Sequence, residues 1–135
     1  MRHATITSDK RRIDPAQAAA IYVELGWGDA KRYSTARMRR SLANCDIVIG
    51  VLNGDGELVG ILRALTDGVT DTKVLDVVLA PEYQGQGIGQ RMMAELAKRA
   101  KGTSIYFETG PKNFDFAKRC GYKRRSGLTV FRKKV

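Results

Sequence analysis

Residues 84–89 hold the pattern in this chain that is most suggestive of chemistry: Gln84, Gly85, Gln86, Gly87, Ile88 and Gly89. An apolar run typical of a buried strand precedes them, and a run with the apolar spacing of an amphipathic helix follows. The first amides of a helix have no partner within it and carry partial positive charge. Glycine lets the backbone approach a ligand closely and adopt positive φ. The segment therefore predicts a main-chain cradle for phosphate groups.

Two other phosphate-binding patterns fit this segment less well. A nucleoside triphosphate loop needs a lysine directly after its last glycine, and none follows here. A dinucleotide-binding loop needs glycine or alanine at position 90, which is Gln90, although Glu108 does lie about 20 residues further on. A glycine-rich helix start with no ligand is the third alternative. Each glycine costs a helix up to about 1 kcal/mol, which favours a use for the exposed backbone.

Two carboxylates could handle a proton or an amine near this cradle. Asp76 is the single charged residue within the apolar run 74–79, and burying it without compensation would be costly. We expect it either to have a hydrogen-bonding partner or to act as a general base, with Glu108 as the second candidate. Since the only histidine is His3, Ser-His-Asp and Cys-His arrangements are not expected.

The two cysteines, Cys45 and Cys120, have no Cys or His partner at metal-ligand spacing. We expect two buried free thiols and no metal site.

Turn residues and apolar periodicity predict the elements that position these groups. Helices are expected from the cap Asp14 to about residue 25, from the cap Ser34 to about residue 44, over 88–101 and over 113–120. Strands are expected at 3–8, 47–52, 58–65, 73–79 and 105–108, with two closing strands at 122–125 and 128–133. The run 74–79 is apolar enough for the middle of a sheet. The fold class is mixed α/β, and residues 1–135 are expected to form a single domain.

The chain resembles the GNAT superfamily of acyltransferases. Gln84, Gly87 and Gly89 match its Gln/Arg-x-x-Gly-x-Gly/Ala signature, and residues 81–83 (Pro-Glu-Tyr) resemble its usual lead-in. The resemblance extends from residues 58–60 (Leu-Val-Gly) to residues 116–122, which end in Cys-Gly-Tyr. It implies a mostly antiparallel twisted sheet of six to seven strands with about four helices and a splayed central strand pair.

The resemblance also implies acetyl-CoA as cofactor and an N-acetyltransferase activity through a ternary complex. Residues 84–89 would hold the pyrophosphate, and the backbone of Val77, Val78 and Leu79 would pair with the pantetheine arm. An amide near Val78 or Leu79 would polarise the thioester carbonyl. The far wall of the channel would be lined by Asn113 and Phe116, and Arg119, Lys118 or Arg91 would meet the ribose phosphate.

The usual general acid of such proteins is a tyrosine at the position that Ala117 occupies here. Tyr122 and Tyr106 have hydroxyls that could replace it, and water or the low basicity of the thiolate could suffice. An inactive CoA-binding regulator is therefore one alternative function. The acceptor would be a small amine or a protein amino group.

Net charge and composition limit the kinds of molecule that this protein is expected to bind. The chain has 135 residues, 43% of them hydrophobic, and a net charge of +10, with a basic last quarter. Such a field favours an anionic partner, either a polyphosphate cofactor or nucleic acid. Nucleic acid is disfavoured because no base-reading motif accompanies the charge. No apolar run is long enough to span a bilayer or to act as a secretion signal. We therefore expect no membrane partner and a cytoplasmic location. The sequence does not decide whether the protein is a monomer or a homodimer.

Overall fold

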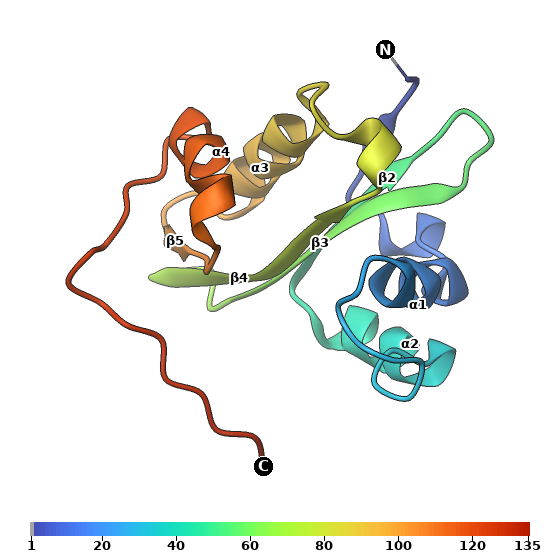
Figure 1. Ribbon diagram of the computed structural model, residues 1–135, viewed down its shortest axis with the longest axis horizontal. Coiled ribbons are helices and arrows are strands. Elements are labelled where there is room, and N and C mark those ends of the chain that lie inside the picture. The colour runs from blue at the N-terminus through green and yellow to red at the C-terminus, as the bar shows by residue number, and fades with distance from the viewer. Residues whose placement is uncertain (1) are drawn as a thin grey trace.

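The computed structural model describes residues 2–135 and shows a mixed five-stranded sheet with helices on both faces (Figure 1). Its strands are β1 (Thr5–Thr7), β2 (Ile47–Leu52), β3 (Leu58–Thr66), β4 (Asp71–Leu79) and β5 (Ser104–Tyr106). Its α-helices are α1 (Pro15–Glu24), α2 (Thr35–Asn44), α3 (Ile88–Arg99) and α4 (Phe114–Arg119). Short 3-10 helices span Lys10–Arg12, Pro81–Tyr83 and Pro111–Asn113.

The strands follow chain order across the sheet. Neighbours from β1 to β4 are antiparallel, while β5 runs parallel to β4 after the crossover through α3. The strand that the apolar run 74–79 predicts is internal, as expected. The α-helical caps are also as predicted, since the side chains of Asp14 and Ser34 accept hydrogen bonds from amides in the first turns of α1 and α2.

The sheet separates two apolar clusters. Helices α1 and α2 cover one face, where Tyr22, Met38 and Ile61 are buried. Helix α3 covers the other, where Leu62, Met92 and Leu96 are buried. Figure 1 shows α1 and α2 below the sheet and α3 and α4 above it. The side chains of β4 reach both layers, with Val78 in one cluster and Val74 in the other, while Leu75 remains exposed.

The expectation of six to seven strands is wrong. Neither closing strand, 122–125 or 128–133, forms, and the chain after α4 runs away from the body of the protein (Figure 1). Its apolar side chains are exposed, Phe131 to 93%. Strand propensity depends on packing against a neighbour. In this tail six Lys and Arg residues between 123 and 134 repel one another, and no described acid in the tail offsets them.

Candidate functional site

A groove opens where β4 and β5 separate. The two strands pair only from Asp71 to Lys73, opposite Ser104 to Tyr106. Beyond that point they diverge, and a cavity of about 990 Å³ lies between the rest of β4 and the segment from Phe107 to Phe116. This is the splayed strand pair that the sequence predicted. Both the glycine segment and the two candidate carboxylates, Asp76 and Glu108, border the cavity.

The glycine segment lies at one end of the groove as an open turn before α3. Gly85 has φ +72° and Gly87 has φ +79°, a region that side chains with a Cβ rarely adopt. Gly87 is the N-cap residue of α3 and offers no side-chain cap. Within residues 2–135, the amides of residues 85–90 donate no hydrogen bond to the protein. The sequence predicts that these N–H groups bind phosphate, and in the structure they are free to donate.

Two glutamine side chains fix the segment in place. Gln84 Nε2 donates to the carbonyl of Leu79 at 2.8 Å, which ties the turn to the end of β4. Gln86 Nε2 donates to the carbonyl of Glu82 at 2.8 Å, and Gln86 Oε1 accepts from the amide of Arg2. The side chains therefore hold the turn, and the free groups that face a ligand are backbone amides.

Gly89 has a different role from the other two glycines. Its φ is ordinary, but a Cβ there would lie 3.0 Å from the ring of Phe116. A larger residue would push α4 away from α3. Ile88, between the two, is buried in the core and anchors the first turn of α3.

The backbone of β4 offers hydrogen-bonding groups to the groove. Ala80 N–H donates to the carbonyl of Val59, so it faces β3. Since N–H and C=O directions alternate along a strand, those of Val78 also face β3, and those of Val77 and Leu79 face the gap. Of the two amides proposed to polarise a carbonyl, the alternation favours Leu79 over Val78.

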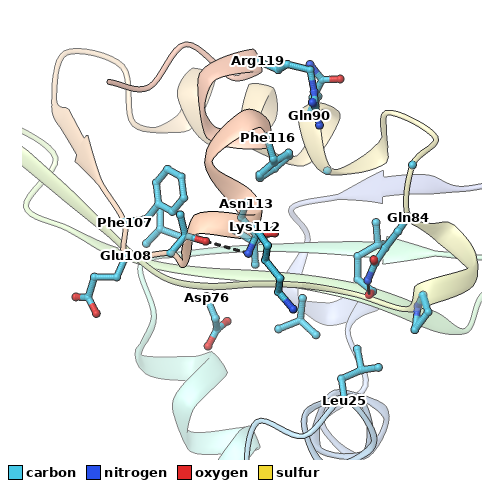
Figure 2. A pocket seen from close by; sticks show the side chains of 18 of the residues that line it. Leu25, Asp76, Gln84, Gln90, Phe107, Glu108, Lys112, Asn113, Phe116 and Arg119 are labelled. Carbon is cyan, nitrogen blue, oxygen red and sulfur yellow. Dashed lines mark hydrogen bonds between the residues drawn. The ribbon is translucent and has the colours of Figure 1, made fainter. Parts of the chain in front are cut away.

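Residues from the end of β5 to α4 form the other wall (Figure 2). Asn113 donates through Nδ2 to Thr109 Oγ1 at 3.0 Å, which leaves its carbonyl oxygen available as an acceptor. Phe116 and Arg119 border the groove as well, while Lys118 and Arg91 are not among its lining residues. Figure 2 shows Arg119 beyond Phe116, on the side of α4 next to Gln90.

Asp76 is buried and fully engaged. Its Oδ1 accepts from the Tyr22 hydroxyl at 2.5 Å and from Arg63 Nε at 3.3 Å, and its Oδ2 accepts from Arg63 Nη2 at 2.5 Å. Burial, reinforced by this carboxylate, raises the pKa of Tyr22. Burial works most strongly against the charge of Arg63, but the hydrogen bonds to Asp76 and the charge interactions with Tyr22, Asp76 and Cys45 together outweigh it and raise the pKa of the guanidinium. The hydrogen-bonding partner, one of the two expectations for Asp76, is present.

Glu108 is the more open carboxylate. It borders the groove, its side chain is 56% exposed, and its Oε1 pairs with Lys73 Nζ at 2.6 Å. In Figure 2 it lies at the opposite end of the groove from Gln84. An amine that enters at this end would meet a carboxylate with unused acceptor capacity.

Tyr122 does not line the groove. Its ring packs edge-on against Phe107, with centroids 4.9 Å apart, and burial raises the pKa of its hydroxyl. Tyr106 also lies outside the lining. Both cysteines are free thiols, with Cys45 buried and Cys120 half-buried.

Sequence reasoning missed several groups around the groove. Leu25 and Trp27, which follow α1, line the groove. Thr109 and Lys112, between β5 and α4, line it as well. It also missed Arg63 and Tyr22, the partners of Asp76. The turn between these strands would not have revealed Arg63, because its register, with Ala64 opposite Val74, shifts by one residue between Ala64 and Arg63 and only thereby places Arg63 opposite Asp76.

Comparison with known proteins shows which family this chain resembles in sequence. The model of the acetyltransferase (GNAT) family matches residues 17–122. An uncharacterized ycf52-like N-acetyltransferase of Prochlorococcus marinus is 26% identical over 107 residues, 77% of this chain and 58% of that protein. The N-alpha-acetyltransferase RimI of Mycobacterium tuberculosis is 32% identical over 76% of this chain and 66% of that protein. The chain thus spans little more than half the length of the Prochlorococcus protein.

Solved structures share the fold. A GNAT family acetyltransferase of Streptococcus pneumoniae superposes with a TM-score of 0.81 at 24% identity, with 98% of each chain covered. An aminoglycoside N-acetyltransferase solved in complex with CoA superposes with a TM-score of 0.75 at 15% identity, covering 100% of this chain and 97% of that one. Within residues 2–135, no helix is both long and apolar enough to cross a bilayer.

Proposed function

The chain belongs to the GNAT family of acetyltransferases, and from that premise we propose that it transfers an acetyl group from acetyl-CoA directly to a primary amine in a ternary complex. The observation that supports this most is the row of unpaired amides at residues 85–90, at the mouth of a groove along β4. On this proposal residues 1–135 act as one catalytic unit. The acceptor is a small amine or a protein amino group.

The cofactor-binding roles follow from the free groups of the groove. The amides of Gly85 to Gly89 bind the pyrophosphate, which glycine at positive φ lets approach closely. The outward groups of Val77 pair with the pantetheine arm, since the Leu79 carbonyl already accepts from Gln84 Nε2. Phe116 and the free oxygen of Asn113 line the other side of the arm. Arg119 meets a phosphate at the groove edge. Bound acetyl-CoA supplies an activated thioester.

The chain's own groups then prepare the transfer. The Leu79 amide polarises the thioester carbonyl from a fixed position, an effect typically worth about 10²–10³-fold in rate. Glu108 binds the incoming ammonium and removes its proton, since its oxygens have spare acceptor capacity. Asp76 holds the acceptor side of β4 in place. With Ala117 at the usual position of the acid and Tyr122 packed on Phe107, water returns the proton to the departing thiolate.

A CoA-release assay over a panel of amines, preceded by calorimetry with acetyl-CoA, tests this function. We expect acetyl-CoA binding and turnover of at least one amine. Glu108→Gln should lower kcat by about 10²-fold while acetyl-CoA binding stays within twofold. Glu57→Gln, in the β2–β3 turn, is the matched control. Binding without turnover of any amine would favour a CoA-binding regulator, and no binding would contradict the assignment.

A further inference from the structure

A second hollow lies on the α2 side of the sheet, outside the cofactor groove. It has a volume of about 280 Å³ and is bordered by polar side chains of α2, the α1–α2 connection and β3. The polar members are Arg32, Arg37, Arg40, Ser41, Asn44 and Arg63. Positions 37, 40, 41 and 44 have the spacing of one helix face, so α2 presents this row together. The neighbouring apolar face, with Met38 and Leu42, packs in the core, and Met38 also borders the hollow.

The charge of this hollow is uncompensated at its rim. Among residues 2–135, no Asp or Glu borders it, and no carboxylate lies within 4.0 Å of a guanidinium nitrogen of Arg32, Arg37 or Arg40. The nearby Asp29 carboxylate accepts from the backbone amide of Arg32 at 2.9 Å and forms no ion pair with these side chains. Arg63, deeper in, is neutralised by Asp76. Three guanidinium groups around one small space repel one another. The arrangement is stabilised if an anion enters.

The arginines are partly oriented before any ligand arrives. Arg37 Nε donates to the carbonyl of Arg32 at 2.8 Å, which leaves its terminal nitrogens unused. Arg32 lies over the ring of Tyr33, 5.5 Å from its centroid. Arg63 Nη1 donates to Ser41 Oγ at 2.6 Å and so closes the floor of the hollow. Planar guanidinium groups that border one small space can bind a phosphate or a carboxylate through paired N–H donors.

The hollow and the cofactor groove share a wall. Arg63 borders the hollow, and its partner Asp76 borders the groove. A second link runs through stacked rings: Tyr33 borders the hollow and lies 4.6 Å from Tyr22, which contacts Trp27 of the groove. The hollow and the groove therefore adjoin across the Arg63–Asp76 pair.

We propose that the hollow formed by Arg32, Arg37 and Arg40 binds an anionic group, a phosphate or carboxylate, of the acceptor amine. This rests on the proposed function, since it names the class of amine that the enzyme acetylates. The space suits one such group. A nucleic acid strand would instead need cations spread along a surface to meet successive phosphates.

Direct binding is tested with inorganic phosphate on the protein saturated with CoA, so that the cofactor groove is occupied. Arg37→Gln combined with Arg40→Gln should abolish the rise in melting temperature that phosphate gives. Arg39→Gln, on the same helix but outside the hollow, should keep it. Equal rises in all three proteins, or none in the parent, would overturn the proposal. Phosphate binding that needs Arg37 and Arg40 supports the site even if no amine is acetylated, which would count against the proposed function alone.

Turnover of matched amines tests the acceptor class. We expect O-phosphoethanolamine to be acetylated with a kcat/KM about tenfold or more above that of ethanolamine, mainly through KM. The double variant should lose this preference, and Arg39→Gln should retain it. The peptides Ala-Glu-Glu and Ala-Gln-Gln, compared in the same way, distinguish an acidic peptide from a small amine as the source of the anion. An unchanged preference in the double variant, or sub-micromolar binding of a single-stranded oligonucleotide that this variant loses, would contradict the proposal.

Discussion

The two sides of β4 are built in opposite ways. On the side of the glycine turn, the groups available to a ligand are backbone amides, and glutamine side chains only hold the turn. On the side of α1 and α2, the polar groups are side chains, and Tyr22, Arg63 and Asp76 bind one another completely. The glycine turn keeps unsatisfied donors for a ligand, while the Tyr22–Arg63–Asp76 cluster uses its polar groups for stability. Substitutions in the turn should change binding, and those in the cluster should change folding.

Gly87→Val should have the largest effect on the glycine side. A β-branched residue at φ +79° strains the turn and blocks the approach of a phosphate to the backbone. We expect acetyl-CoA affinity to fall by at least about 100-fold, enough to remove the rise in melting temperature that acetyl-CoA gives. Gly56→Val is the matched control, because Gly56 has φ +79° and no neighbour within 4 Å but lies in the β2–β3 turn. If acetyl-CoA raised the melting temperature of Gly87→Val as much as that of the parent, the proposal that this turn binds the cofactor would be wrong.

Asp76→Ala tests the opposite side. It leaves the buried Arg63 guanidinium without its partner, so we expect the free energy of unfolding to fall by about 3–5 kcal/mol, measured by urea denaturation. Acetyl-CoA affinity should stay within about twofold where the protein is folded. Asp71→Ala, at the exposed start of the same strand, is the control. A variant with parental stability and lost turnover would show instead that Asp76 acts on the amine.

Tyr22→Phe removes one hydrogen bond to Asp76 and should lower the free energy of unfolding by about 1 kcal/mol. Because folding raises the pKa of Tyr22, the protein gains stability from this phenol below its unfolded pKa of about 10 and loses it as the pH rises further. The parent should thus lose stability above pH ~10 more steeply than the variant. Tyr33→Phe, whose ring stacks on Tyr22, should leave this slope unchanged.

Arg119→Ala should have the smallest effect. Its charge is at the exposed edge of the groove, where solvent screens a contact with phosphate. We expect acetyl-CoA affinity to fall by about three- to tenfold, with a shallow dependence on salt, and Lys123→Ala to change nothing. Titration at two salt concentrations, beside duplex and single-stranded nucleic acid, measures this. A steep salt dependence shared with nucleic acid would give the basic tail a different role.

The sequence by itself determined the glycine turn and the order of elements up to α4. A strand, a glycine turn and a helix adjoin one another along the chain, and their bonding groups belong to the backbone, so local pattern was enough to predict the cradle. Gly89 is a partial exception. Its motif position was evident, but its contact with Phe116, from a helix well further along the chain, was not.

Only the tertiary structure decided what surrounds Asp76 and what becomes of the tail. Tyr22 and Arg63 reach Asp76 from 54 and 13 residues away, and whether a buried carboxylate is paired depends on such neighbours rather than on its own strand. Residues 122–133 have strand-like residues, yet a strand forms only where an edge and a packing surface meet it. The sequence shows that α2 contains several arginines and is positively charged. Its convergence with Arg63 on one hollow required the packing of α2 against the sheet.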